Sequence, residues 1–386
     1  MQKQEFNFDR VYPRRQSDSI KWNLFAADVL PLWVADMDFA SPVEVVMAIQ
    51  ERLSQPLFGY AQDDDELRYL VCDWVAKRHQ WNIEPEHILI MCGVVSGMNW
   101  VAQSFIQNGE GIAFQTPVYP PFFKVSSHVD CPREEILLTA GQNSYEIDFD
   151  LFESRLAENT RLFILCNPHN PVGRVFNRTE LEKIGEICLR RNILICSDEI
   201  HCDLTYSGHK HIPLAALSPE LAASSVTLMA PSKTFNIPGL NLSFAVVPND
   251  DLRNRLQMAR RGIISPPDLL ANAAARGAYR HGDRWLQALC EYLEGNRDYL
   301  MNFIMEKMPA IKVFKPQGTY LAWLDCRKLS LDVDPCEFFL DQAKVALNNG
   351  LDFGKNGQGF VRLNFGCPRS VLVDALERME RALKST

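Results

Sequence analysis

Three polar residues of this sequence could carry chemistry, because each follows an apolar run typical of a buried strand. Asn170 lies in NPHNPVG, Asp198 in DEIHCDL and Lys233 in PSKTFN. A lysine with small and apolar neighbours is partly desolvated, which lowers the pKa of its amine and makes it nucleophilic. A buried Asp needs a positive or hydrogen-bond-donating partner, because an unpaired buried carboxylate is costly. These positions are the first candidates for a catalytic site.

Each of the three also has an ordinary structural interpretation. Most lysines are solvated surface charges, and Asp198 could simply cap the helix that follows it. The two Asn-Pro pairs around Asn170 predict a tight irregular loop, since proline lacks an N–H donor and biases the preceding residue away from helix. What favours function is the recurrence of such residues after successive apolar runs.

Two further features could bind anions. GVVSG (93–97) opens a predicted helix, where free N–H groups and the positive end of the helix dipole attract negative charge, although its spacing is not that of a nucleotide motif. Arg362 interrupts an apolar run in GFVRLNFG, so it either reaches past the strand to solvent or pairs with a buried carboxylate. Together with Lys233, Asp198 and Asn170, these features could hold a phosphorylated aldehyde and the carboxylate of an amino acid.

The elements that must position these residues form an alternating pattern. Short apolar runs predict strands, and amphipathic runs between them predict helices, which indicates a mostly parallel sheet covered on both faces. Ligands of such sheets bind at the carboxyl ends of the strands. A capping box of Thr179 and Glu182 supports one helix start. The predicted strands are 88–92, 112–115, 162–166, 193–197, 226–230 and 243–247, and the helices between them include 97–108, 179–191 and 250–261.

The pattern changes after a long predicted helix over 282–307. The predicted strands 312–314, 319–324 and 359–364 are interleaved with helices 335–346 and 369–384, which indicates a smaller α+β unit. The first forty residues carry turn signals and only short apolar runs. We therefore expect an N-terminal segment (1–44) packed on the small domain and the active site, a large ligand-binding domain (45–285) and a small C-terminal α+β domain (286–386).

Composition excludes several classes of protein. A net charge of −8 argues against a general nucleic-acid binder. No apolar run reaches the roughly 18 residues of a membrane span, and the first residues do not have the pattern of a secretory signal. The eleven cysteines are irregularly spaced with no C-x-x-C pair, which favours reduced thiols in the cytoplasm over disulfides or a metal site. We expect a cytoplasmic enzyme without a metal.

The order NPHNPVG, DEIH, SKTFN and VRLNFG resembles the motif series of fold-type-I pyridoxal-phosphate enzymes, the aminotransferase class I/II superfamily. Within it, the chain looks most like the C–S lyase branch, the MalY/PatB-type cystathionine β-lyases. The segments that carry the closer match are SDSIKW (17–22), LPLWVADMDF (30–39), FGY (58–60), DEIHCDL (198–204) and SKTFNIPGL (232–240). The resemblance covers nearly the whole chain and implies the α/β fold type I of aminotransferases, with pyridoxal 5'-phosphate as cofactor.

The resemblance assigns a role to each chemical candidate. Lys233 would carry the cofactor as a Schiff base and then serve as the general base. Asp198 would pair with the protonated pyridine nitrogen. Asn170 would bond the ring oxygen O3′ and help to hold the substrate carboxylate. Arg362 would clasp that carboxylate, with Ala35 beside it.

It also assigns the remaining contacts of the cofactor. Tyr119 would stack on the ring, and the backbone of Val94 and Val95, with the hydroxyl of Ser232, would bind the phosphate. Tyr60 would reach the phosphate of a neighbouring subunit, which implies a homodimer with active sites at the subunit interface. Without the resemblance, both tyrosines would be read as aromatic packing residues.

Three positions depart from the broad aminotransferase pattern. His201 stands where many aminotransferases have a tyrosine on O3′, so we place it among the cofactor-binding residues without a defined role. Asn241 replaces a phosphate-binding arginine, and Ala230 replaces the first serine of S-x-S-K. All three changes weaken an assignment as a transaminase, and the first two resemble the lyase branch.

The resemblance implies α,β-elimination from a small sulfur amino acid. Cystathionine, and also cysteine or its S-conjugates, would yield a thiol, pyruvate and ammonia, and homocysteine from cystathionine would serve methionine biosynthesis. An aminotransferase on the same fold is the alternative. A rival of another class is a regulatory protein that binds a transcription factor, which would need only surface contacts and not the Lys, Asp and Asn set.

Overall fold

The computed structural model describes residues 6–260 and 268–385. Its centre is a seven-stranded sheet in the order β2-β10-β9-β8-β7-β3-β4, in which β10 runs antiparallel to both neighbours and the other pairings are parallel. These strands are β2 (Ile88–Met91), β3 (Gly111–Thr116), β4 (Arg133–Leu137), β7 (Thr160–Cys166), β8 (Leu194–Asp198), β9 (Ser225–Met229) and β10 (Ser243–Val246).

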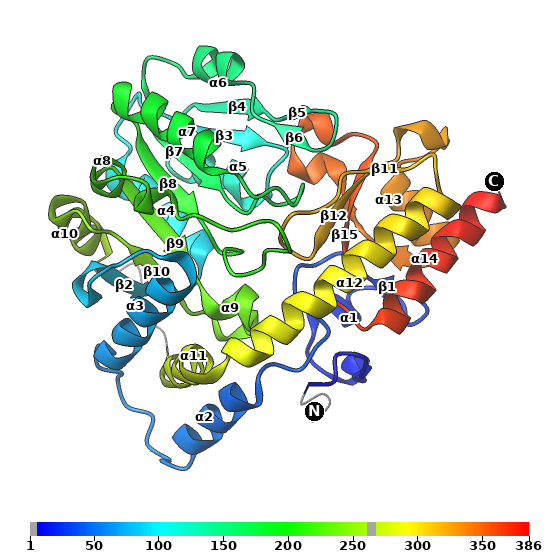
Figure 1. The fold of residues 1–386 in the computed structure, drawn as a ribbon, viewed down its shortest axis with the longest axis horizontal. Coiled ribbons are helices and arrows are strands. Elements are labelled where there is room, and N and C mark those ends of the chain that lie inside the picture. The colour runs from blue at the N-terminus through cyan, green and yellow to red at the C-terminus, as the bar shows by residue number, and fades with distance from the viewer. Residues whose placement is uncertain (1–5, 261–267, 386) are drawn as a thin grey trace.

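The sheet is buried on both faces, which explains its continuous apolar runs. In β7, Leu162 and Ile164 pack on one side with α4, α5 and α10, while Phe163 and Leu165 pack on the other with α6, α7 and α8. Figure 1 shows these helices around the sheet. Their bounds are α4 (Val94–Phe105), α5 (Pro121–His128), α6 (Phe149–Arg155), α7 (Arg178–Arg190), α8 (Pro219–Ala223) and α10 (Asp250–Arg260).

A second, four-stranded antiparallel sheet has the order β11-β12-β15-β14 and lies beside α12 and α14 (Figure 1). Two short pairs, β1 with β13 and β5 with β6, complete the strands. The mixed α/β architecture confirms the expected fold class. These strands are β1 (Leu30–Pro31), β5 (Thr139–Ala140), β6 (Tyr145–Glu146), β11 (Lys312–Val313), β12 (Leu321–Asp325), β13 (Val345–Ala346), β14 (Asn348–Asn349) and β15 (Phe360–Asn364).

The remaining helices pack around these two sheets. The long α12 contacts α14 along its side, and α2 and α3 protrude at the lower left of Figure 1, where both contact α11. Their bounds are α1 (Ile20–Asn23), α2 (Val43–Leu53), α3 (Asp65–His79), α9 (Pro231–Thr234), α11 (Leu269–His281), α12 (Asp283–Lys307), α13 (Pro335–Phe338) and α14 (Arg369–Lys384).

Two local predictions from the sequence are wrong. The capping box of α7 is formed by Asn177 and Glu180, two residues before the predicted pair, and the Asn177 side chain accepts from the Glu180 N–H at 3.0 Å. The predicted helix 335–346 ends early: after α13 it widens into a π-turn and stops at Lys344, whose φ is +55°. The residues that follow pair with β1. Of the predicted helix 250–261, residue 261 lies outside the described residues.

None of the described cysteines forms a disulfide. Among the described residues, no helix combines the length and the apolar character needed to cross a membrane.

Candidate active site

A cavity of about 440 Å³ lies at the carboxyl ends of β7, β8 and β9, where the topology of a parallel sheet places ligands. It is lined by nearly all the residues singled out from the sequence, which come from segments as far apart as residues 35 and 362. They are Ala35, Val94, Val95, Tyr119, Asn170, Asp198, His201, Ser232, Lys233 and Arg362. The structure therefore brings the predicted site residues together in one cavity, with Tyr60 as the exception.

Lys233 lies in α9, the single helical turn that follows β9. Its Nζ donates a hydrogen bond to the backbone carbonyl of Ala35. Burial lowers the pKa of the Lys233 amine to about 8, although the negative charges of Asp36 and Asp198 act in the opposite direction. A useful fraction of the amine is therefore neutral near pH 7, as a nucleophile or general base requires.

Asp198 ends β8 and is buried. One of its carboxylate oxygens accepts from the Ile200 N–H at 3.1 Å, so part of the capping role considered from the sequence is real. No lysine, arginine or histidine of the described chain lies within ion-pair distance of it. Burial raises the pKa of the Asp198 carboxyl to about 7, which indicates that a cationic partner is missing from the protein itself.

Arg362 is fully enclosed within β15, so it does not reach solvent. Its guanidinium donates to Asn170 Oδ1 at 3.0 Å and to the Trp33 carbonyl at 2.8 Å, and it also bonds Asn348. All three acceptors are neutral, Nε has no partner, and burial lowers the pKa of Arg362 to about 10. Among the described residues no carboxylate neutralises this charge. The guanidinium group is therefore available to bind the carboxylate of a ligand.

The opposite end of the cavity suits an anion. Gly93 has a φ of +85° and precedes α4, so the first N–H groups of that helix, at Val94 and Val95, lack partners within the helix. Ser232 and Asn241 line the same cavity. This part of the cavity therefore offers helix N–H groups and neutral side chains to an anion.

Aromatic and imidazole groups form the walls. Tyr119, Trp33 and Phe353 line the cavity, and burial raises the pKa of the Tyr119 phenol, which keeps it protonated. His201 is buried with an Nδ1 that has no partner, and burial together with the charges of Lys233 and Arg362 lowers its pKa well below the ordinary value. His201 is therefore neutral at pH 7 and can still make a hydrogen bond to a ligand.

Apart from Ala35, which was predicted near the substrate carboxylate, sequence reasoning missed the backbone groups of the segment 33–38, which we call the strap. Its carbonyls accept from Lys233 at Ala35 and from Arg362 at Trp33, and Tyr320 also donates to Ala35 at 2.8 Å. The strap is held in place by Asp38, which binds the buried Lys21 at 2.8 Å. The motifs SDSIKW and LPLWVADMDF supply these residues, but a carbonyl contact gives no signal in side-chain type.

Tyr60 is the candidate that the structure does not bring to the cavity. It is fully exposed on the loop between α2 and α3, together with Leu57 and Phe58. Nothing in a single chain places its hydroxyl near the other site residues.

The comparisons with known proteins give the family. The family model "Aminotransferase class I and II" matches residues 27–379. The chain belongs to this family. Cystathionine beta-lyase PatB of Bacillus subtilis (strain 168) is 40% identical over 388 residues, which cover 98% of this chain and 100% of PatB.

Two solved structures share the fold over nearly the whole chain. A putative aminotransferase from Clostridium difficile 630, bound to pyridoxal phosphate, has a TM-score of 0.95 at 38% identity, with 98% of this chain and 100% of that chain covered. Cystalysin from Treponema denticola, which contains pyridoxal 5'-phosphate, has a TM-score of 0.95 at 33% identity, with 99% of this chain and 100% of that chain covered. These matches confirm the expected family, fold and cofactor.

Proposed function

We propose that this protein is a pyridoxal-phosphate-dependent carbon–sulfur β-lyase that cleaves cystathionine, and also cysteine or its S-conjugates, to a thiol, pyruvate and ammonia. The observation that carries the proposal is one cavity in which a lysine of lowered pKa, Lys233, faces a buried arginine without a carboxylate partner, Arg362. The chain-long similarity to a cystathionine beta-lyase supports the choice of reaction.

The cavity fits the cofactor group by group. The uncompensated carboxylate of Asp198 matches a protonated pyridine nitrogen, and the helix start at Val94 and Val95 with Ser232 matches the phosphate. Tyr119 offers a ring face, and Asn170 and His201 offer hydrogen bonds at the cavity wall. When bound, pyridoxal phosphate supplies the electron sink that stabilises negative charge at the substrate Cα.

The residues of the chain then bind, orient and move a proton. Arg362 holds the α-carboxylate with Asn170, and Ala35 lies where it can contact the same group. Lys233, once its amine is free, takes the Cα proton on Nζ, which requires the neutral form that burial favours. A thiol then leaves from Cβ, and water completes the conversion of the remaining fragment to pyruvate and ammonia.

The charge of the cavity favours substrates with an electrically neutral side chain. Lys233 and Arg362 are the cations among its described lining residues. Lys233 acts at Cα and Arg362 binds the α-carboxylate, so neither is available to pair with a charged side chain. The rest of the wall near Trp33 and Phe353 is uncharged. A thioether fits such a wall without the cost of an unpaired buried charge.

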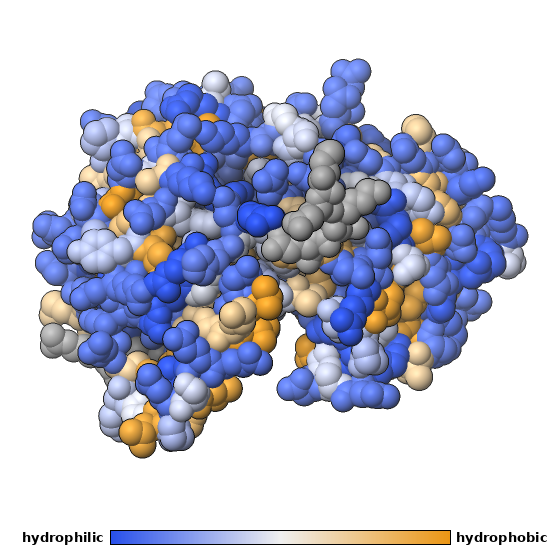
Figure 2. Space-filling model, turned by 60° about the horizontal axis from the view of Figure 1, so that its bottom comes forward, coloured by the Kyte–Doolittle hydropathy of each residue, from blue (hydrophilic) through white to orange (hydrophobic). Residues whose placement is uncertain are grey.

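A homodimer would complete the site. The exposed apolar side chains Val46, Met47, Leu57 and Phe58 gather on α2 and the loop that follows it. Figure 2 shows apolar side chains along the lower left edge of the molecule. Exposed apolar patches of this kind mark protein contacts. A second copy seated here would explain the exposure of Tyr60 if its hydroxyl reaches the phosphate in the neighbouring subunit.

The wider setting follows from the same proposal. A thiol product such as homocysteine would place the enzyme in sulfur amino-acid metabolism and methionine biosynthesis, in the cytoplasm, where the free thiols stay reduced. We also propose the division into an N-terminal segment (1–44), a large cofactor-binding domain (45–285) and a small domain (286–386).

The test is an assay of the purified holoenzyme with cystathionine, in which released thiol and pyruvate are both measured without an added keto acid. We expect equal amounts of the two products. Lys233→Ala should lose the covalently bound cofactor's visible absorbance and at least about 100-fold of the rate. Release of pyruvate by this variant at the wild-type rate would contradict the proposal.

The same assay separates the rivals. An aminotransferase would need an added α-keto acid and would form a new amino acid in place of thiol. A purely regulatory protein would release no product, yet a Lys233→Ala variant would still bind its partner. An enzyme that shows elimination together with partner binding would have regulation as an additional activity.

A further inference from the structure

Asp203 lies behind the active site, outside the cavity, and is the most heavily hydrogen-bonded carboxylate of this region. It is buried and receives Arg78 Nε at 3.0 Å, His79 Nε2 at 3.1 Å, Trp74 Nε1 at 3.1 Å and Thr234 Oγ1 at 2.9 Å. Three of these donors belong to α3, whereas the fourth belongs to α9. One side chain therefore joins two helices that are far apart in the sequence.

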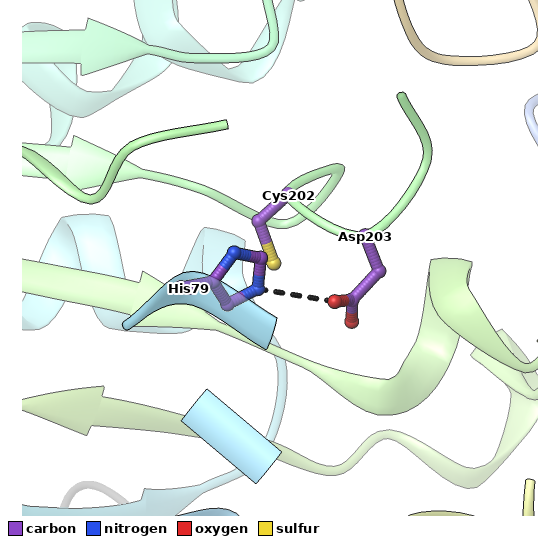
Figure 3. Close-up of side chains that lie close together, drawn as sticks. All are labelled: His79, Cys202 and Asp203. Atoms are coloured by element: carbon purple, nitrogen blue, oxygen red, sulfur yellow. Dashed lines mark hydrogen bonds and ion pairs between the residues drawn. The ribbon is translucent and has the colours of Figure 1, made fainter. Parts of the chain in front are cut away.

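The cluster formed by His79, Cys202 and Asp203 has the composition of a metal site (Figure 3). Its ligand atoms are, however, already in use. His79 is bonded to Asp203, whose oxygens are also occupied by Arg78 and Thr234, and burial raises the pKa of the Cys202 thiol well above its ordinary value. A metal ligand must be a deprotonated thiolate, so the cluster is better explained as a structural anchor.

The anchored element carries Lys233. The helix α9 is one turn long, too short to be stable by its own hydrogen bonds, so its position must be fixed by side chains. Thr234, the residue after Lys233, donates to Asp203 on one side. Phe235 continues the contact, with its ring 5.4 Å from that of Trp74.

A second anchor holds the other side of the same turn. Asn236 has a φ of +55°, accepts from the Met37 N–H at 2.9 Å and donates to the Met37 and Phe39 carbonyls at 2.9 and 2.8 Å. The strap that accepts the Lys233 hydrogen bond is thus tied to α9 independently. Lys233 lies between an anchor to α3 and an anchor to the strap.

We call the hydrogen-bonded residues around Asp203 the layer. Its contacts extend to the loops that carry the other site residues. The ring of His79 packs edge-on against His211 at 5.4 Å, and His211 bonds Glu199, the neighbour of Asp198, at 2.7 Å. His211 also lies 3.4 Å from the Nδ2 of Asn167, in the loop of Asn170. Residues close in sequence to Asn170, Asp198 and Lys233 are therefore connected outside the cavity.

We propose that Asp203 is a positioning residue for Lys233, acting through the hydroxyl of Thr234. The proposal rests on the proposed function for its account of what Lys233 does. Asp203 touches neither cofactor nor substrate, and its contribution is the placement of Nζ. Small displacements of a reacting group are costly, so loss of one hydrogen bond behind Lys233 should be visible in its chemistry.

Thr234→Val tests the link with the least change, because valine keeps the shape of threonine and removes only the hydroxyl. Thr234→Ser keeps the hydroxyl and should restore function. Thr227→Val is the matched control, since Thr227 is a fully buried threonine of β9 whose hydroxyl has no partner. The main readout is the rate at which cofactor-free protein captures added pyridoxal phosphate on Lys233, followed by visible absorbance.

We expect capture by Thr234→Val to fall about 10-fold, with kcat lowered and KM unchanged, while Thr234→Ser and Thr227→Val stay within about twofold of the wild type. Equal rates for the two valine variants would overturn the proposal, as would equal losses in Thr234→Val and Thr234→Ser. If Thr234→Val does not fold, Thr234→Ala takes its place under the same criteria. Capture needs no thioether substrate, so failure of the lyase assignment would leave this readout intact and distinguishable.

Discussion

The cavity and the layer beneath it contain the same kinds of groups in opposite states. In the layer, Asp203 is surrounded by donors that hold its pKa below the ordinary value despite burial. In the cavity, five residues away, Asp198 has one backbone donor and a pKa raised to about 7. A buried polar group that the protein satisfies stabilises the fold, whereas one that it leaves unsatisfied is reserved for a ligand.

The largest expected effect is on the free energy of unfolding, which substitutions of these two aspartates should change in opposite directions. At pH 8, Asp198→Asn should raise the free energy of unfolding of the cofactor-free protein by up to about 4 kcal/mol, because the buried charge is removed. Asp203→Asn should lower it by about 3 kcal/mol, because Arg78 and His79 lose their buried anionic partner, although Arg78 keeps Asp283. Denaturant unfolding of both cofactor-free variants measures the difference.

The pH dependence provides the control. The Asp198 carboxyl prefers its proton in the folded state, so its stabilising contribution is present below about pH 4 and is lost as the pH rises through about 7. The advantage of Asp198→Asn should therefore vanish in acid. For Asp203 the contribution is present above about pH 4 and is lost as the pH falls further. If both variants changed the free energy of unfolding in the same direction at pH 8, the two aspartates would not differ in the way proposed.

Two buried arginines provide the next test. Arg297 is paired with Glu294 at 2.9 Å and Asp298 at 2.8 Å, whereas Arg362 has only neutral acceptors in the described chain. Arg362→Lys should reduce kcat/KM about 100-fold with little change in Tm, since lysine cannot make the two-pronged contact with a carboxylate. Arg297→Lys should lower stability by about 1 kcal/mol and leave kcat/KM unchanged. If Arg297→Lys lost activity while Arg362→Lys kept it, the roles assigned to the two arginines would be wrong.

A smaller effect concerns the acidity of Lys233. Only the neutral amine attacks an aldehyde, so cofactor capture by the cofactor-free protein should rise about tenfold for each pH unit below the pKa of about 8 and level off above it. Stopped-flow absorbance across this range measures the profile. An exposed lysine, with a pKa near 10.4, would show no plateau there, and such a profile for Lys233 would argue against its burial in solution.

The smallest single-variant effect should come from Tyr60, which would contribute one phosphate contact from a partner. Tyr60→Ala should weaken cofactor retention roughly 5-fold, the loss of about one hydrogen bond. Its mixture with Lys233→Ala is more informative. In a shared-site dimer, hybrids have one native site with Lys233 from one subunit and Tyr60 from the other, so cofactor affinity of the mixture should partly recover. No recovery after subunit exchange would show that Tyr60 does not act across an interface.

The sequence predicted six of the seven strands of the central sheet, because these are buried and read as continuous apolar runs. It missed the edge strand β4, whose sequence REEIL is mostly polar and only partly buried. It also located Asn170, Asp198 and Lys233, since polar residues after such strands share one sheet edge. Arg362 was left open between solvent and a buried anion, because a strand residue can point to either face and only the packing decides.

The failures share a physical cause. Lys344 ends a helix that local propensity would continue, because the following residues pair with β1, more than 300 residues away. Asn177 and Thr179 are both good capping residues, and only the geometry selects the first. The carbonyls of Trp33 and Ala35 act in the site, yet any residue type could supply a carbonyl. Long-range pairing and backbone contacts are invisible to a local pattern.

The strap has a consequence for how the protein is made. Lys233 donates to the carbonyl of Ala35, and Arg362 donates to the carbonyl of Trp33 in the same segment. The strand that carries this arginine, β15, is synthesised after all the strands of the central sheet. A nascent chain can therefore fold its central sheet first, but it acquires a closed site only after residue 362 has been synthesised, and chains truncated before residue 362 should purify colourless.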